Sequence, residues 1–182
     1  YFFDCSSPWT YLSFRGILEL RDKKDFEIIW KPILVGGIFN SINPSVYESR
    51  KNPVEEKLKY SQKDLKDWAN LRNLEINWPK IFPINSVKAM RGAFHFIERN
   101  TLEDYLESVF SGYWTHGKDI SNIDTLLQIV NKIGEDQEQY LEVVNSEEAK
   151  QKLIENTQEL MERGGFGSPT FFVNGDDMYF GN

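Results

Sequence analysis

The chain is poor in the residue types that most readily mark a metal or disulfide site. Among its 182 residues there are one cysteine and two histidines. The single Cys5 excludes any intrachain disulfide framework. His95 and His116 lie far apart in the sequence and have no cysteine partner, which argues against a Cys/His zinc site. We therefore expect no metal.

The chain also lacks a surplus of positive charge and any long apolar run. Its 21 Lys and Arg are outnumbered by 28 Asp and Glu, giving a formal net charge of −7, whereas a phosphate-backbone partner requires clustered Lys and Arg. No apolar run approaches the ~20 residues of a membrane helix. We expect no nucleic acid or membrane partner and a cytoplasmic location. Because the chain opens at Tyr1 without an initiator Met, we expect it to be trimmed, and organellar if a targeting segment was removed.

What the chain does contain is bulky core material in ordinary globular proportions. Hydrophobic residues make up 40% and charged residues 27%, with 13 Phe, 8 Tyr and 5 Trp. This length suffices for one domain with a core, or for a small domain that carries a sizeable insertion.

The first 35 residues predict a β-α-β unit. Residues 1–5 are typical of a short strand, and Ser7-Pro8 is a helix start, with a hydroxyl at the N-cap and proline at the first helical position. The helix should reach about Lys23. A second strand is predicted over residues 26–34, with a right-handed crossover if the strands are parallel. The helix residues that we expect to be buried are Leu12, Ile17, Leu18 and Leu20.

Residues 36–163 change in character. Residues 36–53 are rich in Gly, Asn, Ser and Pro, which predicts a long irregular loop. Helices should dominate afterwards, and apolar spacing of i, i+3, i+4 and i+7 predicts individual ones. These predicted helices lie around residues 87–97, 102–113, 123–133 and 146–163, the last one closed by Gly164-Gly165. A hairpin follows, in which Asn174-Gly175 forms the loop and Met178-Tyr179-Phe180 the returning strand.

Together, these features resemble the thioredoxin fold, and within it the 2-hydroxychromene-2-carboxylate isomerase and kappa-class glutathione transferase family of the Dsb-like branch. The most specific element is Ser7-Pro8-Trp9-Thr10 paired with the late Ser168-Pro169. Further matching stretches are Phe3-Asp4-Cys5-Ser6, Gly36-Gly37-Ile38-Phe39, Lys57-Leu58-Lys59-Tyr60, Phe82-Pro83-Ile84-Asn85-Ser86 and Gly117-Lys118-Asp119-Ile120.

The resemblance implies an α/β thioredoxin-like fold (β-α-β … β-β-α) with a large all-helical domain inserted after the second strand. We expect residues 1–35 and 164–182 to form the discontinuous thioredoxin-like domain, truncated at its C-terminal end. Residues 36–163 would form the helical insertion with its connecting loop. The family's Asp-Arg pair, which grips the γ-glutamyl end of glutathione, would follow Asn182.

Ser7 is the predicted catalytic residue. Where the redox relatives carry Cys-Pro-X-Cys, this chain carries two hydroxyls, so neither thiol needed for disulfide exchange is present at these positions. A hydroxyl at a helix N-terminus can instead stabilise the thiolate of another molecule. A plain helix cap is the alternative for an isolated Ser-Pro, and Ser6 competes only if the helix starts one residue earlier.

The resemblance also implies contacts for glutathione, the expected cosubstrate or cofactor. A cis bond before Pro169 would present the backbone of Ser168 to the cysteinyl part of glutathione, like an added strand. Asn43 and Lys57 match the family's glutathione-binding Asn and Lys. Because the match requires a gap near Ser41 and an extra stretch around residues 48–54, Asn40 and Lys51 are the fallbacks.

The remaining candidates concern the substrate. Trp9, Phe39 and Trp114 would line an aromatic substrate pocket, although aromatic residues in a helical cap are more often core. We expect Cys5 to be buried and inert, His95 to be structural and His116 to lie in a loop or at a helix end.

Three functions remain open from the sequence. The first is a glutathione-dependent isomerase, with a kappa-like glutathione transferase as its alternative on the same machinery. The second is a thiol-disulfide oxidoreductase that uses Cys5, and the third is a silent thioredoxin-like binding module. For the first we expect a small aromatic or electrophilic substrate and a homodimer.

Overall fold

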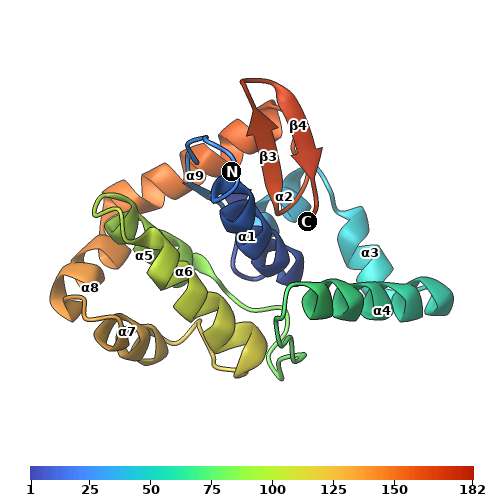
Figure 1. The fold of residues 1–182 in the computed structure, drawn as a ribbon, viewed down its shortest axis with the longest axis horizontal. Coiled ribbons are helices and arrows are strands. Elements are labelled where there is room, and N and C mark those ends of the chain that lie inside the picture. Colours follow the sequence, from blue (N-terminus) through green and yellow to red (C-terminus); the bar gives the residue numbers. More distant parts are fainter.

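The computed structural model describes residues 1–182 and contains a four-stranded sheet with helices around it (Figure 1). The strands are β1 (Phe2–Phe3), β2 (Lys31–Pro32), β3 (Thr170–Val173) and β4 (Asp177–Phe180), in the order β2-β1-β3-β4. The β1–β2 pair is parallel, whereas β1–β3 and β3–β4 are antiparallel. The first and last segments of the chain therefore share one sheet, as predicted.

The helix α1 (Pro8–Arg21) connects β1 to β2. Leu12 is buried as predicted, but Leu20 is 48% exposed, because the end of α1 and the residues after it lie outside the core. The second strand is shorter than predicted. Phe26, Ile28 and Trp30 alternate in burial with exposed neighbours, as a strand would, but only Lys31 and Pro32 pair with β1.

The prediction of an irregular loop over residues 36–53 is wrong. This segment forms α2 (Val35–Ser41) and α3 (Ser45–Lys51). The start of α2 is anchored by the Asp4 carboxylate, whose Oδ2 accepts the Val35 N–H at 2.9 Å. Ile38 is fully buried against the sheet. These tertiary anchors outweigh the low helix propensity of the glycines in α2.

The helices between α3 and β3 form most of the core. They are α4 (Glu55–Leu71), α5 (Val87–Ile97), α6 (Leu102–Phe110), the π-helix η1 (Ser111–Thr115), α7 (Ile123–Lys132), α8 (Gln137–Asn145) and α9 (Glu147–Glu162). The four helices predicted by spacing are confirmed, although the one starting at Leu102 changes to π-helical form at Ser111. None of the helices is both long enough and apolar enough to span a membrane.

The sheet is covered on both faces. Phe3 and Phe2 are neighbours in β1, so their side chains point to opposite faces. Phe3 packs in the core cluster that includes Tyr11 and Phe14 of α1. Phe2 packs with Ile33, Ile38 of α2 and Leu160 of α9. The helix α9, which lies within the range predicted as insertion, thus covers the second face; the domain division itself stays a prediction.

Candidate active site at the start of the first helix

Ser7 is positioned by the junction of β1 and α1. It adopts an extended conformation (φ −109°, ψ 126°) as the N-cap of α1, and its Oγ accepts a long hydrogen bond of 3.4 Å from the Thr10 N–H. Pro8 occupies the first helical position, as predicted. Ser7 is partly exposed. Its hydroxyl is therefore both at the positive end of the helix and within reach of solvent.

The Ser168–Pro169 bond is cis, and the loop that contains it faces Ser7. The Ser7 hydroxyl donates to the Ser168 carbonyl oxygen at 3.2 Å, across 161 positions of sequence. The backbone N–H of Ser168 has no acceptor within the chain, and neither does that of Trp9 in the first turn of α1. Two backbone N–H groups thus remain available around this junction, next to a Ser7 hydroxyl whose proton is donated to the Ser168 carbonyl.

A second set of hydrogen bonds fastens this loop from inside. The Ser168 Oγ accepts the Asp4 N–H at 2.9 Å and lies 2.8 Å from the Thr10 Oγ1. Thr10 has no exposed surface, and Ser168 is 7% exposed. This role of Thr10 was missed from sequence, since the motif alone does not show which hydroxyl points inward.

Asp4 is a buried carboxylate below the site. Burial raises its pKa, and hydrogen bonds from the backbone N–H groups of Ser6 and Val35 oppose that rise. The Oδ1 atom accepts from Ser6 at 2.9 Å, and the Oδ2 atom accepts from Val35 at the same distance. This side chain therefore fixes both the approach to Ser7 and the start of α2, and it too was missed from sequence.

Cys5 is fully buried, as predicted. Burial raises the pKa of its thiol well above the usual range, and the nearby Asp4 adds to the rise. A buried thiol that resists ionisation is a poor nucleophile. The Cys5 carbonyl oxygen accepts the Trp114 Nε1–H at 2.9 Å.

The prediction that Trp114 lines an aromatic substrate pocket is wrong, and the alternative that it belongs to the core is confirmed. Its side chain has no exposed surface, because the π-helix η1 turns it inward onto the Cys5 carbonyl. It supports other aromatic residues instead: its ring centroid lies 5.9 Å from that of Trp78 and 6.2 Å from that of Phe82. Trp78 is 60% exposed and Phe82 is partly exposed, so these two residues are the solvent-accessible members of this aromatic cluster.

Asn43 lies beside the cis-proline loop. Its Nδ2 donates to the Phe166 carbonyl at 3.2 Å, two residues before Ser168. The fallback Asn40 instead accepts from the hydroxyl of Tyr47. The structure thus connects Asn43, rather than Asn40, with the Ser7 region.

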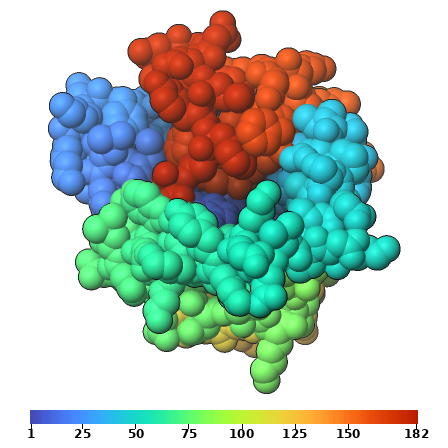
Figure 2. Space-filling model, turned by 90° about the vertical axis from the view of Figure 1, so that its right-hand side faces the viewer, coloured from blue at the N-terminus to red at the C-terminus, as the bar shows by residue number.

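Lys57 is exposed on α4 and takes part in none of the ion pairs of the chain. The same is true of the fallback Lys51 at the end of α3. Trp9 and Phe39 are both partly exposed. Figure 2 shows a hollow between the red hairpin, the cyan segment of α2 and α3 and the green α4, with dark blue atoms of the N-terminal segment at its bottom.

The histidines lie outside this region. His95 is fully buried on α5, 3.7 Å from a Glu135 oxygen, and burial together with the charge of Arg99 lowers its pKa. His116 is exposed at the end of η1. Nowhere do three or more His, Cys, Asp or Glu come together in a way that could hold a metal ion.

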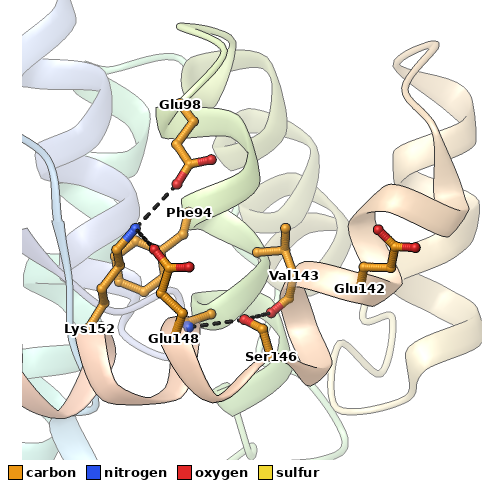
Figure 3. A pocket seen from close by; sticks show the side chains of 8 residues that line it. Phe94, Glu98, Glu142, Val143, Ser146, Glu148 and Lys152 are labelled. Atoms are coloured by element: carbon orange, nitrogen blue, oxygen red, sulfur yellow. Dashed lines mark hydrogen bonds and ion pairs between the residues drawn. The ribbon is translucent and has the colours of Figure 1, made fainter.

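A separate surface depression lies between α5, α8 and α9 (Figure 3). Its one cation, Lys152, is already paired with Glu98 at 3.2 Å and Glu148 at 2.8 Å. The Ser146 hydroxyl donates to the Val143 carbonyl and accepts the N–H of a residue in α9. Because its one cation is already paired with two carboxylates, this depression is better explained by helix packing than by ligand binding.

The sheet order, the capped first helix and the facing cis-proline loop define a thioredoxin-type protein whose first helix begins with a hydroxyl in place of a thiol. A sequence profile described as DSBA-like thioredoxin domain matches residues 1–182. The chain belongs to this family.

Known proteins similar to this chain are enzymes. It is 28% identical over 186 residues to 2-hydroxychromene-2-carboxylate isomerase of Pseudomonas sp. (strain C18), covering 100% of this chain and 84% of that protein. It is 26% identical over 196 residues to human glutathione S-transferase kappa 1, covering 100% and 84%. A solved structure of 2-hydroxychromene-2-carboxylate isomerase superposes with a TM-score of 0.80 at 25% identity, covering 99% of this chain and 86% of that one.

Proposed function

We propose that this protein is a glutathione-dependent isomerase of the 2-hydroxychromene-2-carboxylate type, in which Ser7 stabilises the glutathione thiolate. The observation that carries the proposal is the placement of the Ser7 hydroxyl, partly exposed at the N-terminus of α1 and 3.2 Å from the carbonyl of Ser168 beside the cis proline. The isomerase relatives supply the reaction type.

The groups around Ser7 suit a bound cysteinyl peptide. The free N–H of Ser168 and its carbonyl oxygen can pair with the backbone of an extended peptide, as an added strand does. The free N–H of Trp9 and the hydroxyl of Ser7 both lie at the N-terminus of α1, where negative charge is favoured. Asn43 adds a side-chain amide next to the loop. Lys57 is the proposed counter-charge for a glutathione carboxylate.

Glutathione, when bound, supplies a thiolate that adds reversibly to a conjugated substrate, so that the broken conjugation permits bond rotation before glutathione is expelled. Ser7 increases the fraction of thiolate at neutral pH. A thiol has an ordinary pKa of about 8.5, and lowering it by two units requires roughly 2.7 kcal/mol. One charge-assisted hydrogen bond contributes about 1.5–3 kcal/mol, and the helix terminus adds roughly 0.3–1 kcal/mol. Together, the hydrogen bond and the helix terminus are sufficient to lower the thiol pKa by two units.

The hydroxyl of Ser7 has one proton, which it donates to the Ser168 carbonyl oxygen. To act on a thiolate, the hydroxyl must turn toward the sulfur. A peptide N–H that pairs with the Ser168 carbonyl would replace the lost bond, so the rotation need not leave that carbonyl without a donor.

The test of this proposal is the pKa of the bound thiol in Ser7→Ala. We expect it to rise by about one to two pH units relative to wild type, which corresponds to one lost charge-assisted hydrogen bond. The measurement is the ultraviolet absorbance of the thiolate as a function of pH, with turnover followed in parallel. Ser7→Thr, which keeps a hydroxyl and a helix cap, should restore most of the shift, and Ser6→Ala should leave it unchanged.

An unchanged thiol pKa and unchanged turnover in Ser7→Ala would reject the mechanism. A thermal unfolding midpoint that does not respond to millimolar glutathione would instead favour a silent binding module, because a ligand of the folded state must stabilise that state.

A kappa-like transferase is the alternative, since the same thiolate machinery would serve conjugation to an electrophile, and the chain resembles kappa-class enzymes as well. Assays of both reactions on purified protein separate the two. Disulfide exchange has little support, because its only thiol is buried and resists ionisation. A homodimer and a cytoplasmic location remain further proposals.

A further inference from the structure

Arg50 on α3 is held between two aromatic rings. Its guanidinium carbon lies 5.4 Å from the ring centroid of Phe39 and 5.3 Å from that of Phe82. Phe39 belongs to α2, whereas Phe82 belongs to the segment after α4. One cation therefore contacts rings from two segments that are more than forty residues apart in sequence. We call these segments, each with its ring, the Phe39 wall and the Phe82 wall.

Both walls connect to the Ser7 junction. Asn43 lies just after α2, the helix that carries Phe39, and its Nδ2 donates to the Phe166 carbonyl next to the cis-proline loop. On the other side, the Phe82 ring packs against Trp114, whose Nε1–H donates to the carbonyl two residues before Ser7. In Figure 2 the cyan and green parts of the chain, which contain these walls, border the hollow with the N-terminal segment at its bottom.

The Phe82 wall is rigidly attached to the π-helix η1. The Tyr113 hydroxyl donates to the Ile81 carbonyl at 2.7 Å, and the Thr115 hydroxyl donates to the Glu75 carbonyl at the same distance. The N–H of Asn77 donates to a carbonyl of η1, also at 2.7 Å. The backbone that leads to Phe82 is therefore anchored to η1 by three hydrogen bonds.

Arg50 has no anionic partner in the chain. It forms none of the ion pairs and makes no side-chain hydrogen bond, and it is exposed to solvent. Among the acids close to it in sequence, Glu48 accepts from the side chain of Asn52, Glu55 pairs with Lys59, and the exposed Glu56 forms no ion pair with it. In a protein with a net charge of −7, an unpaired guanidinium between aromatic rings calls for an explanation.

We propose that Arg50 recognises the carboxylate of an aromatic substrate whose ring packs beside Phe39 and Phe82. A guanidinium that contacts aromatic rings without a hydrogen-bond partner keeps its N–H donors free, and their fork matches a carboxylate. The rings on either side offer planar apolar surface to the remainder of the same molecule. This inference rests on the proposed function for its substrate class, and it assigns to Arg50 a specificity role that is separate from the thiolate chemistry at Ser7.

The test compares an aromatic carboxylate with its neutral amide. Cinnamate and cinnamamide are titrated by ligand-observed NMR, with and without glutathione, against wild type, Arg50→Met, Arg50→Lys and Lys51→Met. We expect wild type to bind cinnamate about tenfold more tightly than cinnamamide. This ratio corresponds to one charge-assisted hydrogen bond that is moderately screened by solvent. The preference should vanish in Arg50→Met, which keeps an unbranched apolar side chain, and should persist in part in Arg50→Lys.

Lys51→Met is the matched control. Lys51 is the next residue and an exposed cation, but it does not make the contacts with Phe39 and Phe82 that Arg50 makes. Its preference for cinnamate should equal that of wild type. A purely structural role of Arg50 would weaken acid and amide equally and leave their ratio unchanged, which overturns the proposal. An equal loss in Lys51→Met would overturn it too, since it would show a general effect of surface charge.

The same variants separate this proposal from the proposed function. Ser7→Ala should keep the cinnamate preference, and Arg50→Met should keep the pKa of the bound glutathione thiol. If Ser7→Ala leaves that pKa unchanged while Arg50→Met loses the preference, the glutathione mechanism fails and the carboxylate site stands. If Arg50→Met weakens glutathione about tenfold and spares the cinnamate preference, the carboxylate belongs to glutathione and this proposal is wrong.

Discussion

At the scale of single residues, the structure separates two hydroxyls that the sequence treats alike. Ser7 is partly exposed and donates to the Ser168 carbonyl, whereas Thr10 is fully buried and lies 2.8 Å from the Ser168 Oγ. The first hydroxyl can meet a ligand, and the second fastens the cis-proline loop to α1. Ser7 and Pro169 were predictable from their motif, but the roles of Thr10 and Asp4 depend on burial, which the motif does not encode.

Thr10→Val tests this division. The substitution keeps the shape of the side chain but removes a buried hydroxyl partner of the Ser168 Oγ, so we expect the free energy of unfolding to fall by about 1–2 kcal/mol. Urea denaturation followed by circular dichroism measures it. The control is Thr125→Val on α7, where the side chain is partly exposed and makes no hydrogen bond. Equal stability of Thr10→Val and wild type would contradict a fastening role.

At the scale of helices, periodicity predicted those elements that bury a continuous apolar face. The helix α5 matches its predicted bounds, because Val87, Met90, Phe94 and Ile97 mark one face of it. The helices α2 and α3 were missed, since α2 is held by Asp4 and one buried residue and α3 buries none. The change to η1 after Phe110 was also not visible in the spacing.

Gly92→Ala on α5 should destabilise the protein, although alanine is the better helix former by about 1 kcal/mol. A Cβ at this position would clash with a ring carbon of Tyr140 on α8. That ring is fully buried and its hydroxyl is bonded to Tyr105, so it cannot move aside freely. Overpacking of this kind costs about 1–3 kcal/mol or more, and we expect a net loss of roughly 1–2 kcal/mol.

Gly36→Ala is the matched control for this contact. Gly36 lies in α2, and a Cβ there would meet no atom within 4 Å. The same substitution should therefore stabilise the protein by roughly 0.4–1 kcal/mol. Thermal unfolding of the two variants gives opposite shifts of the midpoint if close helix packing is decisive, and parallel shifts if helix propensity alone decides.

At the scale of the whole molecule, α9 joins the helical part to the sheet. The Thr157 Oγ1 accepts the Leu34 N–H at 3.0 Å, and the Asn156 Nδ2 donates to the Pro32 carbonyl at 3.0 Å. Leu160 completes the small apolar cluster on the Phe2 face of the sheet. The face of the sheet opposite α1 is thus closed by a helix more than a hundred residues away along the chain (Figure 1).

Thr157→Val should loosen this connection. Thr157 is 7% exposed, and its loss as an acceptor leaves the Leu34 N–H without a partner in a poorly solvated position, which costs about 1–3 kcal/mol. Amide hydrogen exchange at Leu34 should accelerate along with the loss in unfolding free energy. Thr101→Val is the control: its buried Oγ1 has no hydrogen-bond partner, so that variant should be as stable as wild type or slightly more so.

The sequence by itself determined the β-α-β start, the spaced helices, the terminal hairpin and the candidate hydroxyl at the head of the first helix. These depend on local rules: caps, turns and periodic burial. The tertiary structure decided that Trp114 is a buried support and that Thr10 faces inward. It also decided that α9 covers the sheet and that Arg50 lies between two distant rings. Those outcomes depend on contacts between residues far apart in the chain, and no local pattern specifies which distant atoms meet.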